Sequence, residues 1–461
     1  MIKNTNLIIK ETFALALKNH QNGNLKAAKN LYDKILKIDP KHISALNNLG
    51  LVFQTLMQHQ KAINSFEKAI EINPNNILTL NNLGNVLGSL GINQKAINSF
   101  EKAIEINPNY VDAYNNLGVV FHSLGDSQKA KSFYEKTIGI DLNHKDAHNN
   151  LGLVFQGLGE PQKALSYYKK AIEIDSNFQD AHFNLGVLLY EIGQYKNAIE
   201  EFKLINFKKS KSRLLTCLYK LDFQSLFFKE LDNLINQGEV NAMIGSLISR
   251  SEIRYSVKKP NPFCKEPLKY FLKTNLIEKY DFKNIFIKIA KNILNDNLIS
   301  NKVQNLLTNG FQTTGNLFSQ KNNSIEEIKY IIYSEIEKYR TNFKSSEEGL
   351  IKRWPINYDI YGWLVSMKSG GKIKPHMHED GWLSGSIYIN IPPKLKTDSG
   401  NLVVCIDDKE KTKETKINTQ KIIDVVTGSL CLFPASLHHY TIPFESEEER
   451  IVLAFDVVAK T

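Results

Sequence analysis

The chain has 461 residues, and at about 150 residues per domain this length predicts roughly three structural units. Hydrophobic residues make up 42% and charged residues 23% of the sequence, a composition typical of folded globular proteins that excludes collagen-like and low-complexity chains. The formal net charge is +10, but six of the 58 basic residues are arginine and the lysines are spread along the chain, so we expect no nucleic-acid partner.

The sequence also indicates a compartment. It contains no stretch of 18 apolar residues, which predicts that no segment spans a membrane. The first residues lack an apolar core followed by a small-residue cleavage site, so we expect no signal peptide. The cysteines form no CxxC pair, which is typical of free thiols in a reducing compartment: Cys217, Cys264, Cys405 and Cys431. We therefore expect a cytoplasmic protein.

The first 200 residues repeat with a period of 34. The tripeptide Asn-Leu-Gly recurs at this spacing and starts at Asn48, Asn82, Asn116, Asn150 and Asn184. An alanine follows the same period from Ala28 onward, which adds a degenerate first unit. Small residues at one point and apolar residues at helical spacing predict two closely packed helices in each unit. The pattern resembles the tetratricopeptide repeat, which implies an all-α solenoid of six units over residues 5–207.

The asparagine before each Leu-Gly returns to the same face of the predicted solenoid in every repeat. An amide offers both donors and an acceptor, so a row of amides can hold a peptide backbone. The row formed by Asn48, Asn82, Asn116, Asn150 and Asn184 resembles the asparagine ladder of the O-linked N-acetylglucosamine transferases, which implies a protein or peptide partner in the groove. The alternative is that this asparagine-rich chain uses the residue everywhere, including Asn47 and Asn81 next to the ladder positions.

Residues 208–254 are expected to form a helical connector, because the 34-residue phase is lost there while helical periodicity continues. Ser324 and Glu327 have the spacing of a capping box, in which each side chain bonds the other's backbone N–H. Helical patterns cover three segments after the repeats: Leu226–Asn236, Ile277–Asn295 and Ile325–Tyr339.

From Tyr358 onward the hydrophobic period changes to two. Isoleucines at 387 and 389 alternate with Ser386 and Tyr388, so one face is apolar and the other can line a cavity. Short strands separated by turns predict a jelly roll or double-stranded β-helix with a β core at about 356–459. The predicted strands are Tyr358–Met367, Gly385–Ile391, Leu402–Ile406, Lys421–Val426, Ser429–Phe433 and Arg450–Val458.

Histidine is absent over 193 positions and then clusters at His376, His378, His438 and His439. Two histidines separated by one strand residue point to the same face and can share a metal, and a third from a distant strand would complete a facial site. Adjacent strand residues face opposite ways, so we expect His438 to line the cavity rather than bind the metal. Arg450 follows 11 residues after His439, and its planar fork suits a carboxylate.

These motifs resemble the 2-oxoglutarate- and iron(II)-dependent oxygenases, and the resemblance covers about residues 255–461. The matching positions are His376-Met377-His378, Leu383-Ser384-Gly385, Tyr388, Gly428, Phe433-Pro434, His439 and Arg450. The resemblance implies that His439 is the distal iron ligand. Two registers remain open for the proximal pair, His376 with His378 or His378 with Asp380, and the resemblance favours the first.

The same resemblance implies a binding site for the cosubstrate 2-oxoglutarate. Arg450 would hold its distal carboxylate, while Tyr388 and Asn390 would either hydrogen-bond it or form the cavity wall. The family couples decarboxylation of 2-oxoglutarate by O2 at Fe(II) to hydroxylation of a C–H bond. We therefore predict a dioxygenase that hydroxylates a protein or peptide held by the repeats. A small-molecule or glycan-precursor hydroxylase, and a non-catalytic adaptor with a cupin-like domain, are the alternatives.

Overall fold

The computed structural model describes residues 2–295, 301–302, 306–313, 315–319, 322–407 and 419–460. The chain divides into two compact units, Met1–Asn184 and Leu185–Thr461. Residues 408–418 fall within the predicted β core and lie outside the described residues. Among the helices that are described, none has the length and apolar character needed to cross a membrane.

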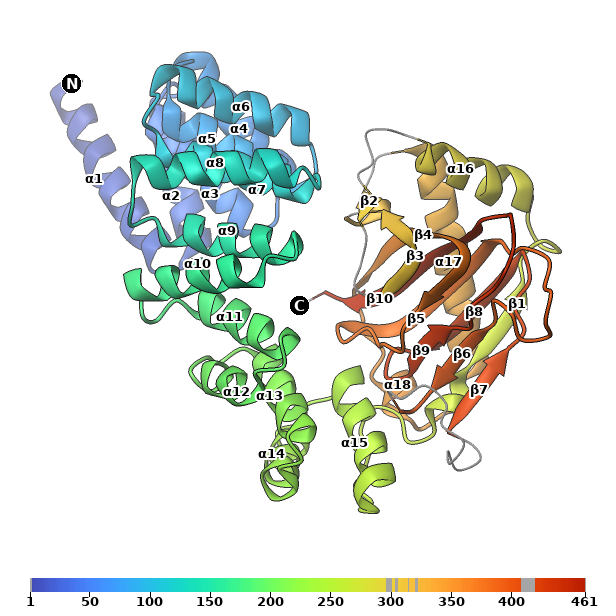
Figure 1. The fold of residues 1–461 in the computed structure, drawn as a ribbon. Helices are drawn as coiled ribbons and strands as arrows, with labels where there is room; N and C mark the ends of the chain where they lie inside the picture. The colour runs from blue at the N-terminus through green and yellow to red at the C-terminus, as the bar shows by residue number, and fades with distance from the viewer. Residues whose placement is uncertain are drawn as a thin grey trace. The chain divides into compact units, whose positions relative to one another are not determined.

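The repeat array consists of helix pairs, as the sequence predicts (Figure 1). Within each pair of the first unit the two helices pack together, and each second helix packs on the next pair. The helices are α1 (Ile2–Gln21), α2 (Leu25–Ile38), α3 (Ile43–Thr55), α4 (His59–Ile72), α5 (Ile77–Ser89), α6 (Asn93–Ile106), α7 (Val111–Ser123), α8 (Ser127–Ile140), α9 (Lys145–Gly157), α10 (Pro161–Ile174), α11 (Gln179–Glu191) and α12 (Tyr195–Lys203).

The glycine of each Asn-Leu-Gly motif faces an aromatic ring on the second helix of its own repeat. A Cβ atom added at Gly118 would lie 2.4 Å from the ring of Tyr134, which is buried, and Gly50 has the same relation to Phe66. The 34-residue period therefore reflects a close helix–helix approach that excludes any side chain at this position.

Gly118→Ala is expected to destabilise the array by about 1–3 kcal/mol, because the new methyl group overpacks against Tyr134. The matched control is Gly139→Ala in α8, where an added Cβ meets nothing within 4 Å. Since alanine is the better helix former, the control should be neutral or stabilising by up to about 1 kcal/mol. Urea unfolding of the full chain measures both, and equal effects would contradict the packing account.

The second unit continues with helices and then forms two β-sheets. After α12, its helical segments are α13 (Lys208–Lys220), α14 (Gln224–Asn236), α15 (Ala242–Tyr255), η1 (Pro267–Tyr270), η2 (Lys283–Ile287), α16 (Lys288–Leu294), η3 (Leu317–Ser319), α17 (Asn323–Asn342) and α18 (Gly349–Lys352). The predicted helices are present, although the pattern that begins at Ile277 becomes helical only from Lys283. Asn322, and not the predicted Ser324, caps α17, since its side chain accepts a hydrogen bond from the Ser324 backbone N–H.

A seven-stranded and a three-stranded sheet form the β core (Figure 1). The larger sheet has the order β1-β8-β5-β10-β4-β3-β2, the smaller one has the order β7-β6-β9, and all pairs are antiparallel. The strands are β1 (Leu272–Asn275), β2 (Asn301–Lys302), β3 (Leu307–Thr313), β4 (Tyr358–Ile373), β5 (Gly381–Asn390), β6 (Leu402–Cys405), β7 (Gln420–Ile423), β8 (Ser429–Pro434), β9 (His438–Thr441) and β10 (Arg450–Ala459).

The two faces of the larger sheet bury different sets of side chains. One face carries Ile387 and Leu453, which pack with α17 in an apolar core. The other face carries Tyr388, which packs with Leu402 and Val404 of the smaller sheet. The alternation in β5 thus places Ser384, Ser386 and Tyr388 in the space between the sheets, as the period-two pattern predicts.

Candidate metal centre

Three histidines converge at one end of the β core. His376, His378 and His439 each offer a ring nitrogen, and these atoms all lie within 4.8 Å of one another. The Nε2 atoms of His376 and His378 are 3.2 Å apart. The ring centroids are separated by 5.1 Å for His376 and His378, 4.3 Å for His376 and His439, and 4.9 Å for His378 and His439. One divalent cation could contact all three rings.

Backbone pairing brings together ligands that are far apart in sequence. The His376 N–H donates to the His439 carbonyl at 3.2 Å, and the His439 N–H donates to the His376 carbonyl at 2.8 Å. This two-residue bridge makes them directly opposed neighbours, which places their side chains on one face. His378 lies outside any strand, in a turn that the Gly381 N–H closes by bonding its carbonyl. The His-x-His pair is therefore a bridge followed by a turn, and not the continuous strand that the spacing suggested.

Burial favours the neutral form of two of the three imidazoles, those of His376 and His439. Burial, followed by the proximity of His378, lowers the pKa of His376 to about 4. Burial also lowers the pKa of His439 far below its usual value, with His376 and His378 contributing in the same direction. Neutral imidazole is the form that binds metals, and three such nitrogen donors suit iron, zinc or copper. The residues present thus fit a transition-metal ion.

The metal-free protein is expected to lose stability as the pH falls from about 6.5 towards 4. Over this range the unfolded chain protonates His376 at about 6.5 while the folded chain resists protonation down to about 4. Above pH 6.5 both states are neutral and the group has no effect. The loss should be roughly 1–2 kcal/mol by pH 5. Thermal unfolding with a chelator measures it, and His376→Gln should flatten the acid side of the profile. An unchanged profile in that variant would contradict the assignment.

Asp380, the alternative ligand, lies apart from the three histidines. Its carboxylate pairs with Lys209 of α13 at 2.9 Å and is 60% exposed. The neighbouring Glu379 pairs with Arg213 of the same helix at 2.6 Å. Both acidic side chains therefore pair with α13. The geometry favours the register in which His376 and His378 are the proximal ligands.

Arg450 is a fully buried cation without an acidic partner among the described residues. It is 2% exposed, and its guanidinium lies 5.2 Å from the ring centroid of Tyr388. Its Nε has no hydrogen-bond partner in the described part of the chain. Burial raises the pKa of the nearby Cys431 thiol to about 12, so this neighbour offers no negative charge. The Tyr388 side chain hydrogen-bonds Arg450 but brings no opposite charge, so an anion beside the guanidinium would offset the cost of burying it.

The interior face of β5 runs from the histidines to Arg450. Ser384 at one end lies 3.4 Å from Nδ1 of His378, whereas Tyr388, four residues further on, contacts Arg450. Ser386 lies between them on the same face, and at about 3.3 Å per residue the strand covers roughly 13 Å over this distance. The space between the sheets therefore has the three histidines at one end and, at the other, a guanidinium with no acidic partner among the described residues.

Family models agree with both halves of this architecture. A model described as "Putative 2OG-Fe(II) oxygenase" matches residues 361–456. Models described as "Tetratricopeptide repeat" match residues 13–42, 43–76, 65–98, 111–144, 146–178 and 167–200, and one described as "TPR repeat" matches residues 89–125. The chain thus resembles tetratricopeptide repeat proteins over residues 13–200 and the family described as a putative 2OG-Fe(II) oxygenase over residues 361–456. A search of curated proteins finds no match.

Solved structures match the repeat protein as well. The crystal structure of MamA is 32% identical over 35% of this chain and 94% of that chain, with a TM-score of 0.32. PilW, described as a widely conserved type IV pilus biogenesis factor, is 22% identical over 46% of this chain and 98% of that chain, with a TM-score of 0.42. YrrB, described as a TPR protein with an unusual peptide-binding site, is 21% identical over 38% and 89%, with a TM-score of 0.30.

In the β domain, Asn390 does not share the face of Tyr388. A register shift between Ile451 and Val452 of β10 places Asn390 opposite Ile451, whose side chain packs on the α17 side of the sheet. The Asn390 amide donates to the Glu449 carbonyl at 2.6 Å, just before Arg450. Asn390 therefore holds the backbone just before Arg450 and lies on the opposite face of β5 from Tyr388.

In the repeat array, the ladder asparagines bond to the asparagines next door. Each donates its amide to the first asparagine of the preceding repeat: Asn82 to Asn47 at 3.0 Å, Asn116 to Asn81 at 2.9 Å, Asn150 to Asn115 at 3.3 Å and Asn184 to Asn149 at 2.9 Å. Asn48 instead donates to the Ser44 carbonyl. The amides therefore form four separate pairs, each of which joins two neighbouring repeats, and the asparagines next to the ladder positions are part of these pairs.

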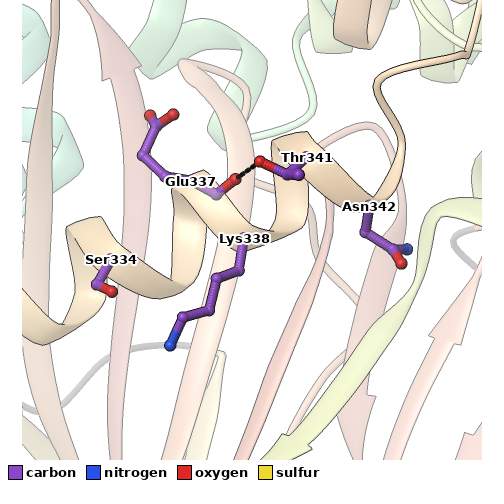
Figure 2. A pocket seen from close by; sticks show the side chains of 5 residues that line it. All are labelled: Ser334, Glu337, Lys338, Thr341 and Asn342. Carbon is purple, nitrogen blue, oxygen red and sulfur yellow. Dashed lines mark hydrogen bonds between the residues drawn. The ribbon is translucent and has the colours of Figure 1, made fainter.

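Two pockets lie away from the histidine cluster, one on α17 and one in the repeat array. One of about 480 Å³ is lined by Ser334, Glu337, Lys338, Thr341 and Asn342 on one face of α17 (Figure 2). In it the Thr341 hydroxyl donates to the Glu337 carbonyl, and none of the lining residues belongs to the histidine cluster. A second of about 230 Å³ lies in the repeat array, where its lining includes Phe13, Asn47 and Asn48.

Proposed function

We propose that the C-terminal domain is a dioxygenase that uses Fe(II), O2 and 2-oxoglutarate. The observation that carries this proposal is Arg450, a buried guanidinium with no acidic partner among the described residues, which shares the interior of the β core with three histidines that could hold a metal ion. A ligand that chelates a metal at one end and carries a carboxylate at the other fits this pair of features. The family match supports the same cofactors.

Each residue has a defined part in this proposal. His376, His378 and His439 would hold Fe(II), and the remaining coordination positions stay free for ligands. Arg450 would pair with the distal carboxylate of 2-oxoglutarate, and Tyr388 would fix the guanidinium by contact with its face. When bound, Fe(II) supplies the redox chemistry that converts substrate C–H, O2 and 2-oxoglutarate into C–OH, succinate and CO2. The apolar side chains between the two sheets exclude water.

The proposed substrate is a protein or peptide bound by the repeat array. The row of amides offers backbone-type hydrogen bonds, and the pocket beside Asn47 and Asn48 adds apolar contacts from Phe13 and Leu17. Such a surface recognises an extended chain by its backbone. A small metabolite would need no array of this kind.

Anaerobic titration of Fe(II) and 2-oxoglutarate into the full chain tests the enzymatic proposal. A visible charge-transfer band is expected, followed on exposure to air by succinate formation. Protein fragments retained by the full chain should then gain about one oxygen mass in an O2-dependent manner. Absence of the band would leave the non-catalytic adaptor. A band with hydroxylation of small molecules alone would favour the small-molecule or glycan-precursor enzyme.

A further inference from the structure

The Asp456 carboxylate hydrogen-bonds one ring of the histidine cluster, that of His378, at its Nδ1 atom. Oδ1 of Asp456 lies 2.7 Å from Nδ1 of His378, on the side of the ring away from the Nε2 atom that faces His376. The Ser384 hydroxyl donates to the same Oδ1 at 2.8 Å. Asp456 is 7% exposed and sits near the end of β10, in register with Ser384.

In this arrangement the negative charge lies on a residue that hydrogen-bonds a ligand candidate, and not on a ligand candidate itself. Many iron sites of this geometry use two histidines and one carboxylate, so that the carboxylate offsets the metal charge. Here the three ligand candidates are all histidines, none of them a carboxylate, and Asp380 binds Lys209 instead. Among the described residues, Asp456 is the carboxylate that hydrogen-bonds a member of the cluster.

We propose that Asp456 is a positioning residue that replaces the missing carboxylate ligand through His378. By accepting the Nδ1 proton it fixes the tautomer that leaves the lone pair of Nε2 directed at the metal position. Its charge makes the imidazole a stronger donor. Ser384 holds the carboxylate in place by donating to the same oxygen. The inference rests on the metal centre of the proposed function and is independent of 2-oxoglutarate use.

Co2+ affinity of the full chain, measured by chelator competition without 2-oxoglutarate, tests this role. Asp456→Asn keeps the shape and an acceptor oxygen but removes the charge, and it should weaken Co2+ binding by about 10–100-fold. Asp456→Glu, which restores the charge, should retain more affinity than Asp456→Asn. Ser384→Ala should weaken binding less than Asp456→Asn does.

The matched control is Asp359→Asn in β4, a carboxylate that pairs with Lys460 and is 60% exposed. It should bind Co2+ as the unmodified chain does. Near-UV circular dichroism of the metal-free variants checks folding, and Ser384→Ala and Asp456→Glu keep the test decisive if Asp456→Asn does not fold. Affinity of the Asn variant within twofold of the unmodified chain would overturn the proposal. Failure of the unmodified chain to bind Co2+ would instead overturn the metal centre itself.

Discussion

Replacing Arg450 with alanine is expected to weaken 2-oxoglutarate binding by about 100-fold or more while leaving Co2+ affinity unchanged. The guanidinium is buried beside Tyr388, so an ion pair with the cosubstrate would form away from water, where it is strong. Arg450→Lys retains a charge but loses the planar fork, and it should bind with intermediate affinity. Isothermal titration of 2-oxoglutarate into the metal-loaded variants measures the effect. Arg353→Ala, at an exposed position, is the control.

Arg450 also leads to a second, independent prediction, which concerns the stability of the protein without ligands. Burial lowers the pKa of Arg450, because desolvation disfavours the charged guanidinium. Arg450→Met, which keeps similar bulk without the charge, should therefore raise the melting temperature of the protein without ligands. If Arg450 serves ligand binding, its burial lowers the stability of the ligand-free protein. If it serves the fold, removing it lowers that stability. A lower melting temperature for Arg450→Met, together with unaltered 2-oxoglutarate affinity, would contradict the proposed role.

The repeats were predictable because the contacts that define them join residues close in sequence and recur every 34 residues. The contact between Gly118 and Tyr134 joins residues within one 34-residue unit, and the same pair returns in the neighbouring units. The amide pairs between repeats, such as Asn116 with Asn81, were not predicted, since the spacing of 35 residues becomes meaningful only once the helices are stacked.

The β domain was predictable in its strands but less so in its pairing. β1 and β3 escaped prediction because they pair with strands far along the chain, Leu272 with Leu432 and Phe311 with Ser366, and their own sequences are short and irregular. Alternation also fails at a bulge, which is why Asn390 lies on the other face.

The histidine cluster was predictable from spacing, whereas the residue behind it was not. His376, His378 and His439 stand out because histidine is absent from the long segment before them. Asp456 follows His378 by 78 residues and belongs to a strand that reads as apolar. A lone acidic residue on the Arg450 face of β10 was the available signal, but only the register with Ser384 links it to the metal centre.

His376→Ala is expected to weaken Co2+ binding by more than about 100-fold, and Asp380→Ala should leave it within twofold of the unmodified chain. The reason is geometric. A ring nitrogen of His376 lies within 4.8 Å of ring nitrogens of His378 and His439, whereas the Asp380 carboxylate is exposed and paired with Lys209. Loss of a ligand should exceed the roughly 10–100-fold effect of losing an outer hydrogen bond. Chelator competition on the full chain measures both variants.

The two variants separate the two ligand registers, because each removes the proximal partner that is unique to one of them. Lys209→Ala serves as a further control, since it frees the Asp380 carboxylate without touching a histidine. If Asp380 were a ligand, Asp380→Ala would lose the metal and His376→Ala would keep it. That outcome would require the turn after His378 to rearrange and to break the ion pair with α13. With the expected outcome, the metal is held by three imidazoles, and its charge must be balanced from outside the ligand set, as the contact between His378 and Asp456 allows.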